Sequence, residues 1–201
     1  MRRWAPIVVV GSMLICGCSL TQPRPEVRHY TLTVPIPEAT AQPAQATLLV
    51  RPFSANEPYN QERLVYRTSP YQLDFYNYHR WAALPVEQVT DWTRQYLRGA
   101  ALFAKVYPTG EGVADFALGG KIRQMDEIDN EQSWEATLSM DFWLTGDDHR
   151  NPFWSQSYTA TRQTARRNPA AVAEAMSHNL EDILGRLAAD LAPVVAAQAG
   201  P

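Results

Sequence analysis

The chain has two cysteines in 201 residues, Cys16 and Cys18, and both lie near its start. A cysteine thiolate is a strong nucleophile that can be acylated, oxidised or bound to a metal ion. Because no cysteine follows Cys18, the rest of the chain can form neither a disulfide framework nor a cysteine-ligated zinc site. Thiol chemistry is therefore confined to the N-terminal end of this protein.

The residues around these cysteines have the order of a secretory signal. Arg2 and Arg3 give a positive start, and an uncharged, largely apolar run follows from Trp4 to Cys16. A membrane-spanning helix needs roughly 20 apolar residues, so this shorter run is typical of a cleaved leader. A retained transmembrane anchor is the alternative.

The leader ends in Leu14-Ile15-Cys16-Gly17-Cys18, which resembles a bacterial lipobox. Ile15 supplies the aliphatic position and Gly17 the small residue before the cut, so we expect Cys18 to become the lipidated N-terminal residue. Acyl chains such as palmitate contribute about 0.8 kcal/mol of membrane binding per buried methylene. By resemblance to lipoprotein sorting, Ser19 predicts the periplasmic face of the outer membrane of a Gram-negative bacterium. The alternative is an ordinary secreted protein with two chance cysteines.

Motifs of nucleophilic, phosphate-binding and metal-dependent enzymes are absent from the sequence. It contains no Gly-x-Ser-x-Gly, no glycine-rich phosphate loop and no His-Glu-x-x-His. The four histidines are scattered along the chain, at His29, His79, His149 and His178. A hydrolase that uses Asp74, His79 and a serine is the one catalytic hypothesis, and no nucleophile motif supports it. We expect no catalytic residue, no metal and no cofactor beyond the covalent lipid on Cys18.

Two acidic clusters lie between predicted strands, at residues 126–131 and 146–149. Carboxylate and amide oxygens are calcium ligands, but the spacing in the first cluster matches no calcium loop. Gly and Asp are common in turns. We interpret both clusters as solvated turns.

Tyrosines and arginines are interleaved between Tyr59 and Trp81, a segment that holds five of the nine tyrosines. Aromatic rings with polar tips, beside arginines, are typical of interaction surfaces. The candidate partner-binding residues in this segment are Tyr59, Tyr66, Arg67, Tyr78, Arg80 and Trp81. The alternative is a hairpin whose rings pack on the core while their hydroxyls reach water.

Hydrophobic periodicity predicts the elements that hold these residues. Alternation of apolar and polar residues predicts strands at 28–34, 46–53, 64–67, 73–76, 103–107, 116–123, 134–144 and 154–160. Pro85 can begin a helix that runs to about Gly99, and Asn168-Pro169 is the N-cap and first residue of a second helix. Arg162, Arg166 and Arg167 precede that helix in what we interpret as a solvated loop, with lipid headgroups or an acidic partner as the alternative.

These elements predict an α+β (mixed α/β) fold with a largely antiparallel sheet and two main helices packed on one face. We expect a single domain. The expected boundaries are a lipoprotein signal peptide at 1–17, the lipidated cysteine and tether at 18–27, the domain at 28–195 and a C-terminal tail at 196–201.

Four segments in this order resemble the ABC-type transport auxiliary lipoproteins, the PqiC-like group. They are the end of the leader at Cys18, the strand 28–32, the block from 50 through 64–67 to 81, and the segment 114–122. Their order and spacing cover nearly the whole mature chain.

The resemblance implies a non-catalytic auxiliary part of an ABC/MCE-type system that moves lipids or other hydrophobic molecules across the envelope. The implied partners are an MCE-domain periplasmic protein, an inner-membrane transport component and the outer membrane, through the lipid anchor. The sequence leaves open whether the protein forms a homo-oligomer. A net charge of −3 gives no basic footprint for nucleic acid. The alternative function is a periplasmic carrier that holds a lipid or small molecule between sheet and helices.

Overall fold

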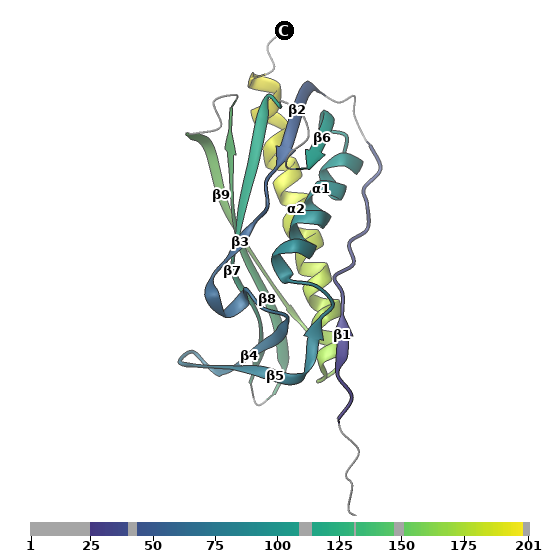
Figure 1. The fold of residues 1–201 in the computed structure, drawn as a ribbon, viewed down its shortest axis with the longest axis vertical. Helices are drawn as coiled ribbons and strands as arrows, with labels where there is room; N and C mark the ends of the chain where they lie inside the picture. Colours follow the sequence, from purple (N-terminus) through teal and green to yellow (C-terminus); the bar gives the residue numbers. More distant parts are fainter. Residues whose placement is uncertain (1–24, 40–43, 109–113, 131, 147–150, 199–201) are drawn as a thin grey trace, which may run out of the picture.

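The computed structural model of the protein describes residues 25–39, 44–108, 114–130, 132–146 and 151–198. These residues form one elongated body in which a curled sheet lies against two helices (Figure 1). The leader, both cysteines and most of the tether lie outside the described residues, as do Glu131 and residues 147–149 of the acidic clusters.

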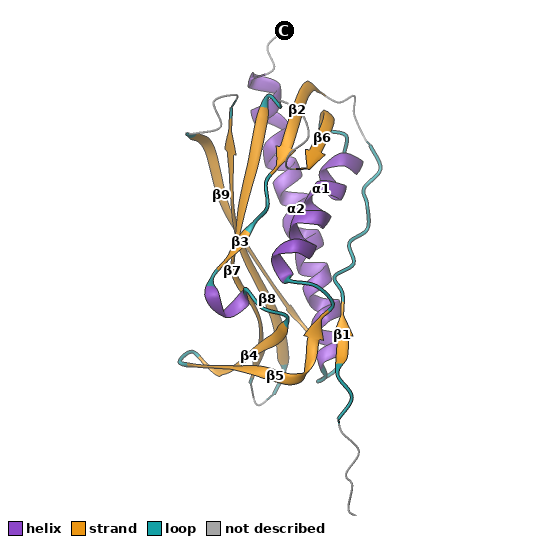
Figure 2. Cartoon of the chain, viewed as in Figure 1, coloured by secondary structure: helices purple, strands orange, loops and turns teal. Residues whose placement is uncertain are grey.

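Nine strands and two long helices make up the described chain (Figure 2). The strands are β1 (Arg28–Tyr30), β2 (Ala44–Val50), β3 (Ser54–Ala55), β4 (Arg63–Ser69), β5 (Gln72–Trp81), β6 (Phe103–Pro108), β7 (Phe116–Asp129), β8 (Trp134–Thr145) and β9 (Pro152–Gln163). The helices are α1 (Pro85–Gly99), α2 (Pro169–Gln198) and the short 3₁₀ helix η1 (Glu57–Tyr59). The α+β class and the single domain are confirmed.

Strand β7 organises the sheet because its two edges are used differently. One edge pairs with β8 along its length, and β8 pairs in turn with β9, both in antiparallel register. The other edge pairs successively with β2, β3 and β4, all parallel to it. The longest ladders are antiparallel as predicted, but the sheet is mixed rather than purely antiparallel, because the chain from β2 to β4 runs alongside β7 in the same direction.

Both helices cover one face of the sheet, and the core lies between the two layers (Figure 1). Helix α2 is 30 residues long, so it spans about 45 Å. Its N-terminus is capped as predicted, since the backbone N–H of Ala171 donates to Oδ1 of Asn168 at 3.0 Å. Leu180, Ile183 and Leu187 of its apolar stripe have no exposed surface.

The segment after β1 was expected to continue as a strand to residue 34, but the strand ends at Tyr30. Leu32 and Val34 are buried in the predicted alternation, yet their segment bonds to helices instead of a neighbouring strand. The backbone N–H of Leu32 donates to Oε1 of Gln88, and its carbonyl accepts from Nε1 of Trp92. Alternation reports which side chains are buried, and it does not identify the hydrogen-bonding partner.

Two adjacent glycines near the start of β7 allow aromatic rings to approach both faces of the sheet. A Cβ at Gly119 would collide with the indole of Trp143, and one at Gly120 would lie 2.9 Å from the ring of Phe53. Phe53 also makes an edge contact with Phe142, with ring centroids 5.6 Å apart. Glycine is needed here because it alone leaves space for both rings.

Candidate functional site

The six predicted partner-binding residues gather at one end of the molecule, on η1, β4 and β5 (Figure 1). These six side chains differ in solvent exposure. Tyr59 and Trp81 are buried in the core, so their side chains stabilise this end and offer no surface to a partner. Tyr66, Arg67 and Arg80 are half-buried, whereas Tyr78 is 44% exposed.

Tyr59 and Arg67 share a buried carboxylate on β7. The hydroxyl of Tyr59 donates to Oδ2 of Asp126 at 2.8 Å, and Nε of Arg67 donates to the same oxygen at 2.7 Å. Arg67 also donates through Nη2 to the Tyr59 hydroxyl at 2.8 Å. Burial, together with the negative charge of Asp126, raises the pKa of Tyr59 to about 12, so its hydroxyl stays protonated.

Glu127, the next residue of β7, lies on the opposite face of the strand and has no exposed surface. The hydroxyl of Tyr76 donates to its Oε2 at 3.0 Å and to its Oε1 at 3.2 Å. Burial raises the pKa of Glu127 to about 7, although the Tyr76 hydrogen bond acts in the opposite direction. This carboxyl group therefore titrates near neutral pH.

The interpretation of the first acidic cluster as a solvated turn is wrong for Asp126 and Glu127. Strand β7 continues to Asp129, and the turn is confined to the residues after it. The sequence signal that could have extended the strand is a pair of apolar residues, Met125 just before the acidic run and Ile128 inside it. These two apolar residues do not predict that the carboxylates of Asp126 and Glu127 bind tyrosine and arginine side chains.

An aromatic chain continues from Tyr76 toward β1. The centroid of the Tyr76 ring lies 4.8 Å from that of the Tyr66 ring. The Tyr76 ring also makes an edge contact with His79, with centroids 5.4 Å apart. Nδ1 of His79 lies 2.8 Å from the hydroxyl of Tyr30. Burial, with a smaller contribution from the charge of Arg28, lowers the pKa of His79. These contacts tie β1 to the hairpin formed by β4 and β5.

The positions of Asp74 and His79 in the structure do not support the catalytic hypothesis. Both lie on β5, but the pairing of this strand with β4 is irregular between them, and His79 contacts Tyr30 and Tyr76 instead. Asp74 accepts instead from Nε2 of Gln72, at 3.0 Å. Within the described part of the chain, no three His, Asp, Glu or Cys side chains come together in a way that could hold a metal ion.

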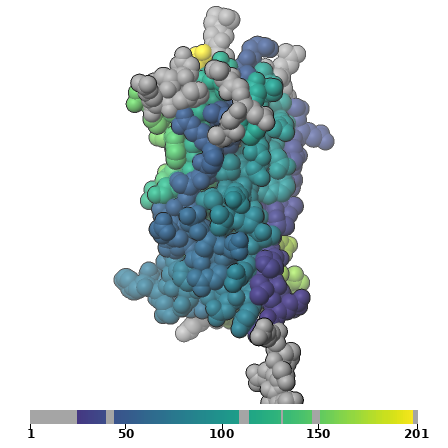
Figure 3. Space-filling model, in the orientation of Figure 1, coloured from purple at the N-terminus to yellow at the C-terminus, as the bar shows by residue number. Residues whose placement is uncertain are grey.

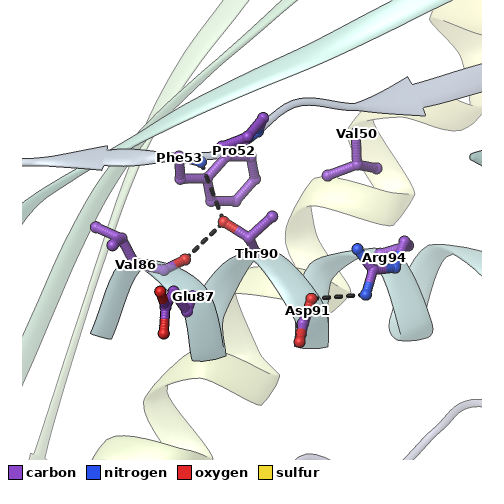
Figure 4. A pocket seen from close by; sticks show the side chains of 8 residues that line it. All are labelled: Val50, Pro52, Phe53, Val86, Glu87, Thr90, Asp91 and Arg94. Atoms are coloured by element: carbon purple, nitrogen blue, oxygen red, sulfur yellow. Dashed lines mark hydrogen bonds and ion pairs between the residues drawn. The ribbon is translucent and has the colours of Figure 1, made fainter. Parts of the chain in front are cut away.

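A groove of about 480 Å³ lies on the side of the body, between α1 and the segment that joins β2 to β3 (Figure 4). Apolar side chains of Val50, Phe53 and Val86 contribute to it, and an ion pair lies at its edge, where Nη2 of Arg94 is 2.6 Å from Oδ1 of Asp91. Thr90 connects its two walls, because its hydroxyl donates to the carbonyl of Val86 and accepts from the N–H of Phe53. This combination of apolar and charged lining could hold a small amphipathic molecule or a partner side chain.

No described helix is both long and apolar enough to cross a membrane. Membrane attachment through Cys18 concerns residues that the structure does not describe.

The fold is found in solved structures of low sequence identity. The crystal structure of protein XCC0632 from Xanthomonas campestris is 22% identical and superposes with a TM-score of 0.76, over 86% of this chain and 98% of that one. The crystal structure of an uncharacterized protein is 11% identical, with a TM-score of 0.64 over 79% of this chain and 99% of that one. No curated protein sequence matches the chain.

The family resemblance seen in the sequence is confirmed over nearly the whole described domain. The match includes β1 from Tyr30, every later strand, α1 and most of α2. A sequence model of the ABC-type transport auxiliary lipoprotein component matches residues 30–192, and the chain belongs to this family.

Proposed function

We propose that this protein is a non-catalytic adaptor, held at the periplasmic face of the outer membrane by lipid on Cys18, in an MCE-type transport system. The observation that carries the proposal is the family match across residues 30–192, because the family is an auxiliary lipoprotein component of ABC-type transport. The lipobox that ends at Cys18 supplies the attachment. The partners are an MCE-domain periplasmic protein and an inner-membrane transport component.

The packing between sheet and helices supports an adaptor that acts through its surface. Leu138 and Met140 of β8 belong to the same buried cluster as Leu180 and Leu184 of α2, and none of the four has exposed surface. A cargo lipid in this layer would have to displace close-packed side chains, which costs several kcal/mol.

The partner surface that we propose is the solvent-facing part of β4 and β5. Tyr78 and Arg80 combine an aromatic ring and a guanidinium on β5, and Tyr66 of β4 packs against Tyr76 of the same strand. Arg80 makes only a long ion pair, 3.9 Å from Glu62, and its Nε is buried without an acceptor among the described residues. The Arg80 side chain as a whole is 40% exposed, so its guanidinium is open to an acceptor on a partner.

Site-specific photo-crosslinking in cells tests the adaptor. A crosslinking amino acid at Tyr78 should capture the MCE-domain protein, whereas one at Glu174, exposed on α2, should not. Cys18→Ser should remove acyl label and release the protein from membranes. Capture of no transport component from Tyr78, in a protein that is lipidated and folded, would contradict the proposal.

The groove beside α1 is the observation that favours the second function, a carrier of a lipid or small molecule. Native mass spectrometry separates the two functions. A carrier should retain a bound lipid mass that Val86→Asp abolishes, because this substitution puts a charge into the apolar lining. An adaptor should show the mass of the lipidated chain alone in both proteins.

A further inference from the structure

The tip of the β4–β5 hairpin and the start of the described chain lie at the same end of the molecule (Figure 1). Strand β1 pairs in parallel with β5, so Arg28, three residues after the first described residue, lies beside His79. The C-terminal end of α2 lies at the opposite end of the body (Figure 1). The first described residues therefore lie at the end of the body that carries the hairpin, which projects sideways from it (Figure 3).

The hairpin tip presents a fully exposed aromatic ring. Tyr71 is 99% exposed, yet the turn that carries it is ordered by Ser69, whose Oγ accepts from the N–H groups of Tyr71 and Gln72 at 3.3 and 3.1 Å. The residues from 68 to 72 carry no charge. Such a tip can enter a partly apolar environment without the cost of desolvating an ion.

Tyrosine is the residue type that suits the boundary between water and lipid. Its ring is apolar and its hydroxyl can stay hydrated, which is why tyrosines concentrate at the headgroup level of membranes. A ring that is 99% exposed contributes almost no packing energy to its own domain. The exposure of Tyr71 therefore points to a surface outside the domain.

We propose that the β4–β5 hairpin tip contacts the phospholipid surface to which Cys18 anchors the chain, with Tyr71 entering the headgroup layer. This inference rests on the proposed lipid attachment. Pro25 follows Cys18 by seven positions, a reach of at most about 25 Å, so the anchor keeps this end of the domain near the bilayer. Anchor and hairpin tip then give two attachment points that fix the orientation of the body.

Fluorescence quenching by labelled lipids tests the contact. Cys16 leaves with the leader and the sulfur of Cys18 carries lipid, so Gln72→Cys introduces a single reactive thiol next to the native Tyr71. The lipidated protein, labelled there with an environment-sensitive dye, is placed in vesicles of phosphatidylethanolamine and phosphatidylglycerol that contain a nitroxide lipid. The matched control carries the dye at Gln198→Cys, on the exposed last residue of α2.

The expected result is several-fold stronger quenching at position 72 than at position 198. Tyr71→Ser in the Gln72→Cys protein should reduce the quenching toward the value of the control. Equal quenching at the two positions, or no effect of Tyr71→Ser, overturns the inference and directs Tyr71 to a protein partner instead. Vesicle flotation of the same samples identifies the cause: a protein that floats without quenching refutes only the hairpin contact, whereas one that does not float refutes the lipid anchor as well.

Discussion

The hydroxyl of Tyr76 donates to both carboxylate oxygens of Glu127, in a place where Glu127 has no exposed surface. The two residues come from β5 and β7, so this hydrogen bond joins the projecting hairpin to the long central strand. A buried carboxyl group is more easily kept protonated than ionised. The end of the molecule that we propose to meet partner and membrane therefore contains an acid that titrates near neutrality.

Glu127 should make the domain less stable as the pH rises through neutrality. Burial raises its pKa to about 7 in the folded protein, above the ordinary value of 4.5. Since the folded state then binds more protons than the unfolded state between these pH values, the free energy of unfolding is highest below about pH 4.5 and falls until about pH 7. The expected loss from this residue is on the order of 3 kcal/mol. Other groups add their own pH dependence, so a difference between variants is the quantity to measure.

Urea unfolding of Glu127→Gln, compared with the unaltered protein at pH 5 and pH 8, measures this contribution. The variant should be relatively more stable at pH 8 than at pH 5. Glu174→Gln, which alters an exposed residue of α2, is the control and should show no such shift. A Glu127→Gln difference that is independent of pH would contradict a carboxyl group that titrates near neutrality.

The ion pair of Arg67 with Asp126 should be costly to break from the arginine side. Asp126 is 1% exposed, so Arg67→Met leaves a buried carboxylate with two neutral donors, the Tyr59 hydroxyl and Nε2 of Gln124, at an expected cost of about 3 kcal/mol. Arg67→Met combined with Asp126→Leu should cost less than the sum of the single variants. Chemical denaturation measures this coupling.

The matched control is the exposed pair of Arg123 and Asp141, 3.3 Å apart on β7 and β8. Breaking it by Arg123→Met should change the free energy of unfolding by less than about 1 kcal/mol. If the Arg67 and Arg123 variants lose the same stability, burial of Asp126 is not what makes its ion pair strong.

Gly119→Ala should destabilise the domain because its new Cβ would overlap the Trp143 indole. Overpacking of this kind costs roughly 1–3 kcal/mol, and Trp143→Ala in the same chain should recover part of the loss by vacating the space. Gly146→Ala is the control, since nothing lies within 4 Å of a Cβ there. Thermal unfolding followed by circular dichroism compares the variants, and equal midpoints for Gly119→Ala and Gly146→Ala would refute the steric argument.

Local signals predicted the elements that depend on local chemistry. Pro85 begins α1 and Asn168-Pro169 begins α2 as expected, because caps and proline act within one helical turn. The hairpin around 68–70 is also confirmed. In each case the deciding residues are adjacent in sequence, so the pattern contains the physical cause.

Contacts between distant segments could not be read in this way. Leu48 of β2 pairs with Phe116, and Tyr66 of β4 pairs with Glu127, both in parallel register. No periodicity encodes which strand lies beside which. The sequence around Asp126 is that of a turn for the same reason. Its burial depends on Tyr59 of η1 and Arg67 of β4, which are about 60 residues away in the sequence.

The segment that connects β1 to the next strand should loosen when Gln88 is removed. Oε1 of Gln88 accepts from the backbone N–H of Leu32 at 2.8 Å, and Leu32 is 1% exposed. Gln88→Ala leaves that buried N–H without its acceptor, at a cost of about 1–3 kcal/mol. Hydrogen exchange should become faster at the amides of Leu32 and Thr33 while the amides of α2 keep their protection. Gln95→Ala, an exposed position of the same helix, is the control; unchanged exchange at Leu32 in the Gln88 variant would mean that other contacts hold this segment.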